Sequence, residues 1–305
     1  MIRSASSALL GSAAADVTVN RAGAFGAGVG VPSGGRRREG VRSLFLLVAT
    51  FVALAVLWEL LKLVLSVPDA RLPHVWHVLH YLGVRTPTGE AEWLYLMRNM
   101  ATTMQEAVVA VILALIIGSL TGILTVKWPI FGRSVTPLLV LSQTLPVVAI
   151  APALVIWLGQ GWVSKSIIAA SIAFFPVAVS VARGMSDIPT DQRLMFHSFG
   201  STNASLFARL ELPNALTQAN AAVPTAAALA VVGAIVAELP SGTSHGIAVV
   251  VLGAAQFYTF EPAALWCAAL TAALGGMLIV YVVRIAFDRA ARLALQTRYL
   301  PTGAL

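Results

Sequence analysis

Ionisable side chains that could carry chemistry are sparse in this chain of 305 residues, of which only 11% are charged. Three acids, Glu59, Glu106 and Glu238, lie in or at the ends of long apolar segments. A carboxylate there is costly and usually marks a functional site or an ion pair. The sequence has no pattern of nucleophile, base and orienting acid. It also lacks the Gly-rich loop with Lys and Ser or Thr that cradles nucleotide phosphates. We therefore expect that the chain is not an enzyme and carries no catalytic residue, cofactor or metal.

Three histidines, His74, His77 and His80, are spaced three residues apart. On a helix this spacing spreads them over about a third of the circumference. Asp69 is the acid close to them in sequence, and no cysteine completes a metal-ligand set. We interpret the histidines as part of an amphipathic helix on the outer surface of the protein.

The composition indicates an integral membrane protein. Hydrophobic residues make up 58% of the chain and its mean hydropathy is +0.84, whereas about a quarter of the residues are charged in an ordinary soluble domain. The net charge of +7 does not indicate nucleic-acid binding, because no basic face interleaved with aromatic residues accompanies it. The fold class that follows is an all-α integral membrane protein.

About six apolar stretches are long enough to cross a bilayer, which takes about 20 residues. They are predicted over residues 43–67, 102–126, 135–158, 164–182, 216–238 and 262–287. A shorter apolar run, 246–257, is too brief to span comfortably and is predicted to be re-entrant or interfacial.

Lys and Arg indicate the orientation, because they collect on the cytoplasmic side of membrane proteins. They precede the first predicted span, lie between the second and third and between the fourth and fifth, and follow the last, whereas residues 239–261 contain none. Both termini are therefore predicted to be cytoplasmic. Residues 1–41, rich in Gly, Ala, Ser and Arg, are predicted to be a disordered cytoplasmic tail. Residues 42–290 form the predicted transmembrane domain, and 291–305 a cytoplasmic C-terminal tail.

Prolines interrupt two of the predicted spans. Pro137, Pro146 and Pro152 lie in the third and Pro176 in the fourth, and each should bend or break its helix. Backbone carbonyls freed at membrane depth are tolerated only when they are buried in protein or face a water-filled cavity. These prolines therefore indicate a translocation pathway, although kinks also occur in purely structural spans. The candidate lining residues are Gln143, Thr144, Pro146, Pro152, Trp157, Phe175, Pro176 and Glu238.

Two further patterns have a structural interpretation. Glu238 could instead cap a helix or pair with a loop, and the sequence favours this structural role over contact with a substrate. Gly118 and Gly122 form a Gly-x-x-x-Gly pair, which lets two helix backbones approach closely in a membrane. We interpret the pair as helix packing within the chain rather than as a dimer seam.

A polar interruption from Arg183 to Leu212 is unusually long for a connection between spans. It contains Phe199-Gly200-Ser201 and then Leu210-Glu211-Leu212-Pro213, with helix-forming residues on both sides of the glycine. A connection of this length between spans indicates a function of its own, and we predict that it binds a partner in the cytosol.

This loop resembles the cytoplasmic signature loop of permease subunits of bacterial ABC importers, in which a glycine precedes an apolar-x-Leu-Pro element at the same spacing. From Arg98 to about Asp288 the chain is similar to the nitrate, sulfonate and taurine type of permease. The family signature opens with Glu-Ala-Ala or a near variant, whereas this chain has Leu194-Met195-Phe196. The other motifs that carry the resemblance are Gln143-Thr144-Leu145-Pro146, the run 151–159, Ser164-Lys165, Phe174-Phe175-Pro176, Gly184 and Val236-Ala237-Glu238.

The resemblance implies a short cytoplasmic coupling helix that docks on an ATP-binding subunit. Phe199, Phe207 and Leu210 would insert into that subunit, and Arg209 and Glu211 would face it or the solvent. Gly200 would allow the turn between helices. The implied coupling residues are Phe199, Gly200, Ser201, Phe207, Arg209, Leu210, Glu211, Leu212 and Pro213.

The resemblance also implies the partners. These are an ATPase that holds ATP and Mg, an extracellular or periplasmic substrate-binding protein, and a second permease copy, all at the bacterial cytoplasmic membrane. The implied function is ATP-driven import of a small organic solute, either a pyrimidine or vitamin precursor or a sulfonate, by alternating access. The alternative is a gradient-driven carrier or channel that works without an ATPase. A carrier of that kind would favour a titratable centre at the membrane midplane. The few acids in the apolar segments of this chain make such a centre a poor fit.

Overall fold

The computed structural model describes residues 35–87 and 89–299, and within these ranges the chain is helical, with one isolated bridge between Arg85 and Ala91 and no strand. The predicted all-α class is confirmed. The chain divides into two compact units, residues 1–61 and 62–305. The described part of the first unit is helix α1 (Gly35–Val64), whose last three residues belong to the second unit. Residues 35–41 of the predicted tail are helical, and the rest of that tail lies outside the described residues.

The second unit contains four helices that are long and apolar enough to cross a membrane. They are α3 (Glu92–Lys127), α6 (Trp162–Ser186), α9 (Leu212–Glu238), which α8 and η1 extend at its N-terminal end, and α11 (Pro262–Tyr299). A bent pair of shorter helices can form a fifth span among the described residues. The remaining predicted span, residues 43–67, falls mainly on α1 and stays a prediction.

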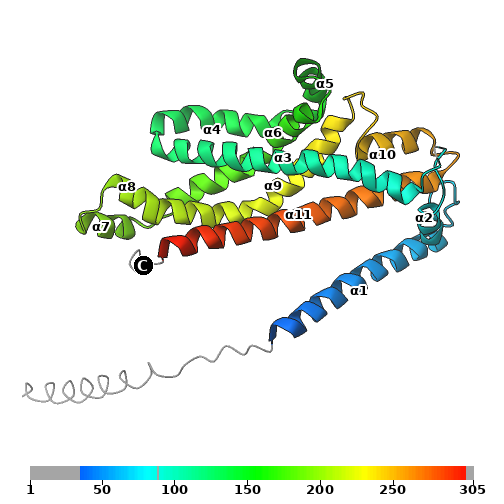
Figure 1. Cartoon of the computed structure of the whole chain (residues 1–305), viewed down its shortest axis with the longest axis horizontal. Coiled ribbons are helices and arrows are strands. Elements are labelled where there is room, and N and C mark those ends of the chain that lie inside the picture. The colour runs from blue at the N-terminus through cyan, green and yellow to red at the C-terminus, as the bar shows by residue number, and fades with distance from the viewer. Residues whose placement is uncertain (1–34, 88, 300–305) are drawn as a thin grey trace, which may run out of the picture. The chain divides into compact units, whose positions relative to one another are not determined.

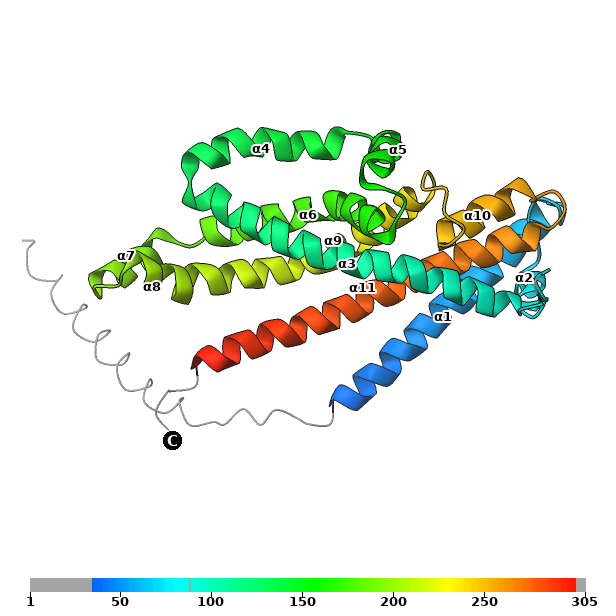
Figure 2. The same ribbon diagram turned by 45° about the horizontal axis from the view of Figure 1, so that its top comes forward.

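The bent pair occupies the predicted third span. Helix α4 (Pro129–Thr144) and helix α5 (Val147–Leu158) meet at an angle of 102°. The break falls at Leu145 and Pro146, because proline lacks an N–H and its ring disfavours helical geometry in the residue before it. Figure 2 shows α4 running back along α3 and α5 leaving the end of α4 at a steep angle to it. The prediction that proline breaks this segment is confirmed at Pro146, whereas Pro137 and Pro152 lie inside α4 and α5. The predicted span over 135–158 is thus a bent pair of helices, either one broken span or a re-entrant segment.

Close packing of α3 against α6 depends on two glycines of α3. A Cβ atom added to Gly118 would lie 2.7 Å from the carbonyl oxygen of Phe174, and one added to Gly122 would lie 2.6 Å from that of Ala178. Lipid gives helices no hydrophobic reason to associate, so backbone contact of this kind supplies the attraction. The interpretation of the Gly-x-x-x-Gly pair as packing within the chain is confirmed.

The shorter helices gather at the two ends of the second unit (Figure 1). At one end lie α7 (Thr190–Ser198) and α8 (Asn203–Leu206). Toward the other end lie α2 (Val75–Tyr81), α5 and α10 (Ile247–Gln256). Helix α10 has ten residues, too few to cross the hydrocarbon core, as its sequence predicted. Helix α11 continues through residues 291–299 of the predicted C-terminal tail.

Replacement of Gly118 by alanine is expected to lower the melting temperature of the purified protein. The added methyl group would overlap the backbone of α6, and overpacking of this kind costs about 1–3 kcal/mol. Gly253→Ala in α10 is the matched control, because nothing lies within 4 Å of its added Cβ. Equal melting temperatures for the two variants in a thermal unfolding experiment would contradict the close contact between α3 and α6.

Candidate functional site

The predicted coupling loop folds as two short helices joined by a tight turn at Gly200. Gly200 has a φ of +71°, a left-handed conformation that glycine adopts without strain. The N–H of Gly200 donates to the carbonyl of His197 at 2.9 Å, and the N–H of Ser201 donates to that of Phe196 at 3.1 Å. These two bonds form a Schellman motif, which ends α7. Thr202 then caps α8 by accepting a hydrogen bond from the N–H of Ser205.

From α8 the chain enters the long helix α9 without a break. A π-helical turn, η1 (Phe207–Glu211), joins the two helices, and Pro213 falls in the first turn of α9. Proline is tolerated there, although its ring conflicts with the carbonyl four residues earlier in an ideal α-helix. The wider π turn comes directly before this proline, and such turns are common at functional sites. It carries Glu211, which is buried.

Glu211 lies at the centre of a group of charges that we call the inner ion-pair centre, formed by Lys127, Arg193 and Glu211. Arg193 Nη1 lies 2.6 Å from Glu211 Oε1, and Lys127 Nζ donates to Glu211 Oε2. The Glu211 side chain is only 3% exposed. The expectation that Glu211 faces solvent or a partner is therefore wrong, because the two cations draw it inward from α3 and α7.

The inner ion-pair centre also reaches the C-terminal end of α6. Arg193 Nη2 donates to the carbonyl oxygen of Met185 at 2.6 Å, and Asn214 Nδ2 donates to that of Gly184 at 2.5 Å. The last carbonyls of a helix have no partner within the helix and favour nearby cations. The helices α7 and α8 are thus tied to the ends of α3, α6 and α9 together.

The outer surface of α7 is apolar at its exposed end. Leu194, Met195 and Phe199, which we call the α7 apolar patch, are 61%, 51% and 80% exposed. Large exposed apolar groups that lie together mark interaction sites. Leu194 and Met195 stand where the family signature has Glu-Ala-Ala, so sequence reasoning treated these two residues only as a departure, whereas it predicted a coupling role for Phe199.

The other predicted coupling residues divide between the surface and the bundle. Arg209 is exposed and Leu210 is half-buried. Phe207 packs against the buried cluster around Val181 and Ala215, and the ammonium of Lys127 lies 5.1 Å from the centroid of its ring. Phe207 therefore contacts its own bundle, which differs from the expectation that it inserts into a partner.

The predicted pathway residues follow the bent pair α4 and α5. Gln143 and Thr144 end α4, Pro146 lies at the bend, and all three are exposed. On α5, Pro152 is exposed and Trp157 is 82% exposed. Their role in lining a pathway stays a prediction. So does that of Phe175 and Pro176, which are half-buried on the unbroken helix α6.

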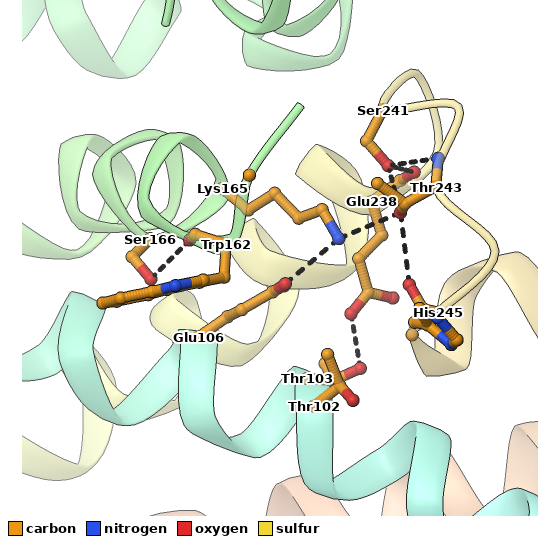
Figure 3. A network of polar contacts seen from close by, with 12 residues as sticks. Thr102, Thr103, Glu106, Trp162, Lys165, Ser166, Glu238, Ser241, Thr243 and His245 are labelled. Carbon is orange, nitrogen blue, oxygen red and sulfur yellow. Dashed lines mark hydrogen bonds and ion pairs between the residues drawn. The ribbon is translucent and has the colours of Figure 1, made fainter. Parts of the chain in front are cut away.

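A second group of charges, the outer polar centre, lies farther along α3 (Figure 3). It consists of Glu106 on α3, Lys165 on α6 and Glu238 at the end of α9. Lys165 Nζ lies 3.1 Å from Glu106 Oε1, and the two side chains are 3% and 0% exposed. The same ammonium donates to the hydroxyl of Thr243 at 3.1 Å. From the rise per residue, Glu106 and Lys127 are roughly 32 Å apart along α3.

Glu238 ties the start of α10 to α3. Its Oε2 accepts the N–H of Ala248 at 2.8 Å, and its Oε1 accepts the hydroxyl of Thr103 at 2.5 Å. That hydroxyl in turn accepts the N–H of Ile247 at 2.9 Å. These contacts satisfy N–H groups that a helix start leaves unpaired. Glu238 thus caps the start of α10, which agrees with the capping role that the sequence favoured, and its part in the pathway stays a prediction.

Sequence reasoning missed the partners in this centre. The sequence singles out Lys165 only as part of the Ser164-Lys165 motif, yet its side chain is buried between α6 and α3. The scarcity of charged residues in the apolar segments is the signal that could have predicted the pairing of Lys165 with Glu106. An ammonium beside an apolar span needs an opposite charge nearby, and Glu106 is an acid in a neighbouring span.

A pocket of about 420 Å³ lies between α2 and the start of α11, and Asp69, His77, His80, Tyr81 and Glu261 are among its lining residues. The hydrogen bond from Lys62 lowers the pKa of Asp69, and burial raises the pKa of Tyr81 to about 12. Within the described ranges, no group of three or more His, Cys, Asp or Glu side chains could hold a metal ion.

Comparison with known proteins agrees with this architecture. The chain is 29% identical over 188 residues to the formylaminopyrimidine transport permease protein ThiX of Halalkalibacterium halodurans, covering 62% of this chain and 72% of that protein. It is 34% identical over 117 residues to the riboflavin transport system permease protein RibX of Chloroflexus aurantiacus, covering 38% of this chain and 43% of that protein. It is 24% identical over 261 residues to the taurine transport system permease protein TauC of Escherichia coli, covering 85% of this chain and 90% of that protein.

A solved structure and a family match complete the comparison. A chain of the MetNI methionine ABC transporter in an inward-facing conformation has the same fold, with a TM-score of 0.52 and 17% identity over 67% of this chain and 98% of that one. Residues 114–293 match the family of binding-protein-dependent transport system inner membrane components. The protein therefore belongs to this family, and it is a permease subunit of an ABC importer.

Proposed function

We propose that α7 and α8 form the docking site for an ATP-binding subunit at the cytoplasmic face of a bacterial plasma membrane. That subunit binds ATP and Mg, whereas this chain supplies half of the translocation pathway. A second copy of the chain completes the pathway, and an extracellular or periplasmic binding protein delivers the solute. ATP binding brings the two docking sites together and drives alternating access.

The observation that carries this proposal is the combination of the α7 apolar patch with the inner ion-pair centre. The patch offers apolar surface to a partner at the end of the bundle. The centre connects α7 through Arg193 and Glu211 to α3, α6 and α9. A close-packed interior transmits a displacement and does not deform continuously. A force on α7 therefore moves α3, α6 and α9 together as one body.

Charge supports the proposed orientation. Lys127, Arg183 and Arg193 lie at or beyond the ends of α3 and α6 that meet α7. The red, C-terminal end of α11 lies toward the same end of the unit (Figure 1). Residues 239–261, at the opposite end, contain no Lys or Arg. By the positive-inside rule, this distribution supports a cytoplasmic location for α7, α8 and both termini.

We infer a small heterocyclic organic solute, such as a pyrimidine or flavin vitamin precursor, ahead of a sulfonate. The support is the higher identity to ThiX and RibX, 29% and 34%, than to TauC, 24%. The exposed residues Gln143, Thr144 and Trp157 provide amide, hydroxyl and aromatic groups along α4 and α5. Such groups suit a flat polar ring, because aromatic faces stack on it and the amide forms hydrogen bonds.

The substitution Phe199→Asp is expected to weaken copurification of the ATP-binding subunit in detergent. Truncation of a central aromatic contact costs about 2 kcal/mol or more, roughly thirtyfold in affinity. Phe260→Asp is the matched control, because Phe260 is 85% exposed in the turn before α11. Equal retention of the ATPase by both variants would contradict docking at α7.

The substitution Glu211→Gln is expected to uncouple uptake from ATP hydrolysis in the reconstituted transporter. Lys127 and Arg193 lose their shared carboxylate, so α7 no longer moves with α3. We expect uptake to fall at least about fivefold, the lower range of allosteric coupling free energies, while ATP hydrolysis continues. The matched control is Glu90→Gln, because Glu90 pairs with Arg98 near the start of α3, away from α7 and α8, and it should change uptake by no more than about twofold. Uptake in Glu211→Gln that survives ATP depletion and follows an ion gradient would instead support a carrier.

The cognate binding protein is expected to melt at a higher temperature with an aminopyrimidine or riboflavin than with taurine. A ligand that binds only the folded state stabilises it by about 2.7 kcal/mol at 100 times its Kd. A thermal shift series with these three compounds measures this preference. Stabilisation by taurine alone would reverse the inferred substrate class and leave the docking site untouched.

A further inference from the structure

The outer polar centre contains more acid than base. Glu106 and Glu238 each have 0% exposure and Lys165 has 3%. The charged groups that act on the two carboxyls are Lys165 and each other. From the other elements around them, Thr103 on α3, Ser241 and Thr243 in the loop, and the start of α10 contribute only hydroxyl or N–H groups. Two ionised carboxylates would therefore leave one buried negative charge without a partner.

An uncompensated charge is unfavourable at this place, because a membrane protein has no water in the hydrocarbon region to solvate it. A buried acid that lacks a partner takes up a proton rather than stay ionised. The Lys165 ammonium neutralises one carboxylate and cannot neutralise two. The simplest neutral arrangement is one ammonium, one carboxylate and one carboxylic acid.

The hydrogen bonds indicate which oxygen holds the proton. Both oxygens of Glu238 already accept hydrogen bonds, from the Thr103 hydroxyl and from the Ala248 N–H. Glu106 is different. Its Oε1 forms the ion pair with Lys165, but among the described residues neither of its oxygens accepts a well-directed hydrogen bond. An oxygen without a donor is the place where a proton removes an unsatisfied buried group.

We propose that Glu106 and Glu238 share one bound proton, carried on Oε2 of Glu106 and donated to the Glu238 carboxylate. The outer polar centre is thus a proton-binding site that makes the contact between α3, α6, α9 and α10 electrically neutral. Glu106 then donates to Glu238, and its second oxygen faces the Lys165 ammonium. Glu238 remains the acceptor that holds the start of α10.

This proton site has a consequence for the structure around it. Separation of α10 from α3 would leave the Glu238 carboxylate without its donors from Thr103 and Ala248. Separation of α3 from α6 would leave Lys165 without Glu106. The bound proton removes the repulsion that would otherwise push α3 and the end of α9 apart, because two carboxylates that share one buried site disfavour joint ionisation.

Infrared spectroscopy of the full chain in lipid nanodiscs at neutral pH tests the proposal, because a protonated carboxylic acid has a carbonyl band distinct from that of a carboxylate. Glu106→Gln and Glu238→Gln should each remove the carbonyl band of one carboxylic acid. In either variant the remaining carboxyl group is ionised, because it pairs with Lys165 alone. The double variant should remove no more than either single one. Glu90→Gln, an exposed acid paired with Arg98, should leave the band unchanged.

The variant Lys165→Met provides an independent readout. Without the ammonium, both carboxyls are protonated to stay neutral, so the acid band should grow by one carboxyl group relative to the wild type. Size-exclusion chromatography and thermal unfolding verify that each variant is folded, and the wild-type and Glu106→Gln spectra alone decide the matter if another variant does not fold.

Two results would overturn the proposal. An acid band that is the same in the wild type and Glu106→Gln would mean that both carboxyls are ionised or that other residues hold the proton. A double variant that removes twice the band of a single one would mean two independent acids. Neither result bears on docking at α7, because this measurement needs no ATPase subunit.

Discussion

The absence of water in the hydrocarbon core is the constraint on which the rest of this structure depends. Every buried charge must find a partner inside the protein, and this chain has few charges to arrange. Four buried charged side chains of the described residues, Glu106, Lys165, Glu211 and Glu238, lie in two places, the inner ion-pair centre around Glu211 and the outer polar centre around Glu238. Helix α3 contributes to both, through Lys127 and Glu106.

The two centres differ in what they hold. The inner centre joins a short surface helix to the ends of three spans, and it has two cations for one carboxylate. Lys127 and Arg193 stay about one-third exposed, so water compensates the excess charge. The outer centre has the opposite imbalance, two acids for one cation, and all three side chains are buried, so its excess charge needs a proton. Burial therefore decides how each centre balances its charge.

Between the centres, the bundle is held by close contact of small residues rather than by large apolar side chains. Gly118 and Gly122 allow α3 to touch the backbone of α6, and alanines fill much of the core. Such packing leaves little room for independent motion of the helices. Such an interior suits the alternating access that we propose, because close-packed helices move as rigid bodies.

Much of this protein was determined by its sequence alone. Apolar length predicted the spanning helices, Pro146 predicted the break between α4 and α5, and Gly200 predicted the turn in the coupling loop, because each is a local property of the chain. Only the tertiary structure decided that Glu211 turns inward, that Lys165 is buried against Glu106, and that Glu238 holds the start of α10. These contacts join residues on different helices, from 10 positions apart for Glu238 and Ala248 to 135 for Glu238 and Thr103. The periodicity of one segment does not say which neighbour it meets. The pairing of charges is a property of how the helices pack, so it exists only once they are packed.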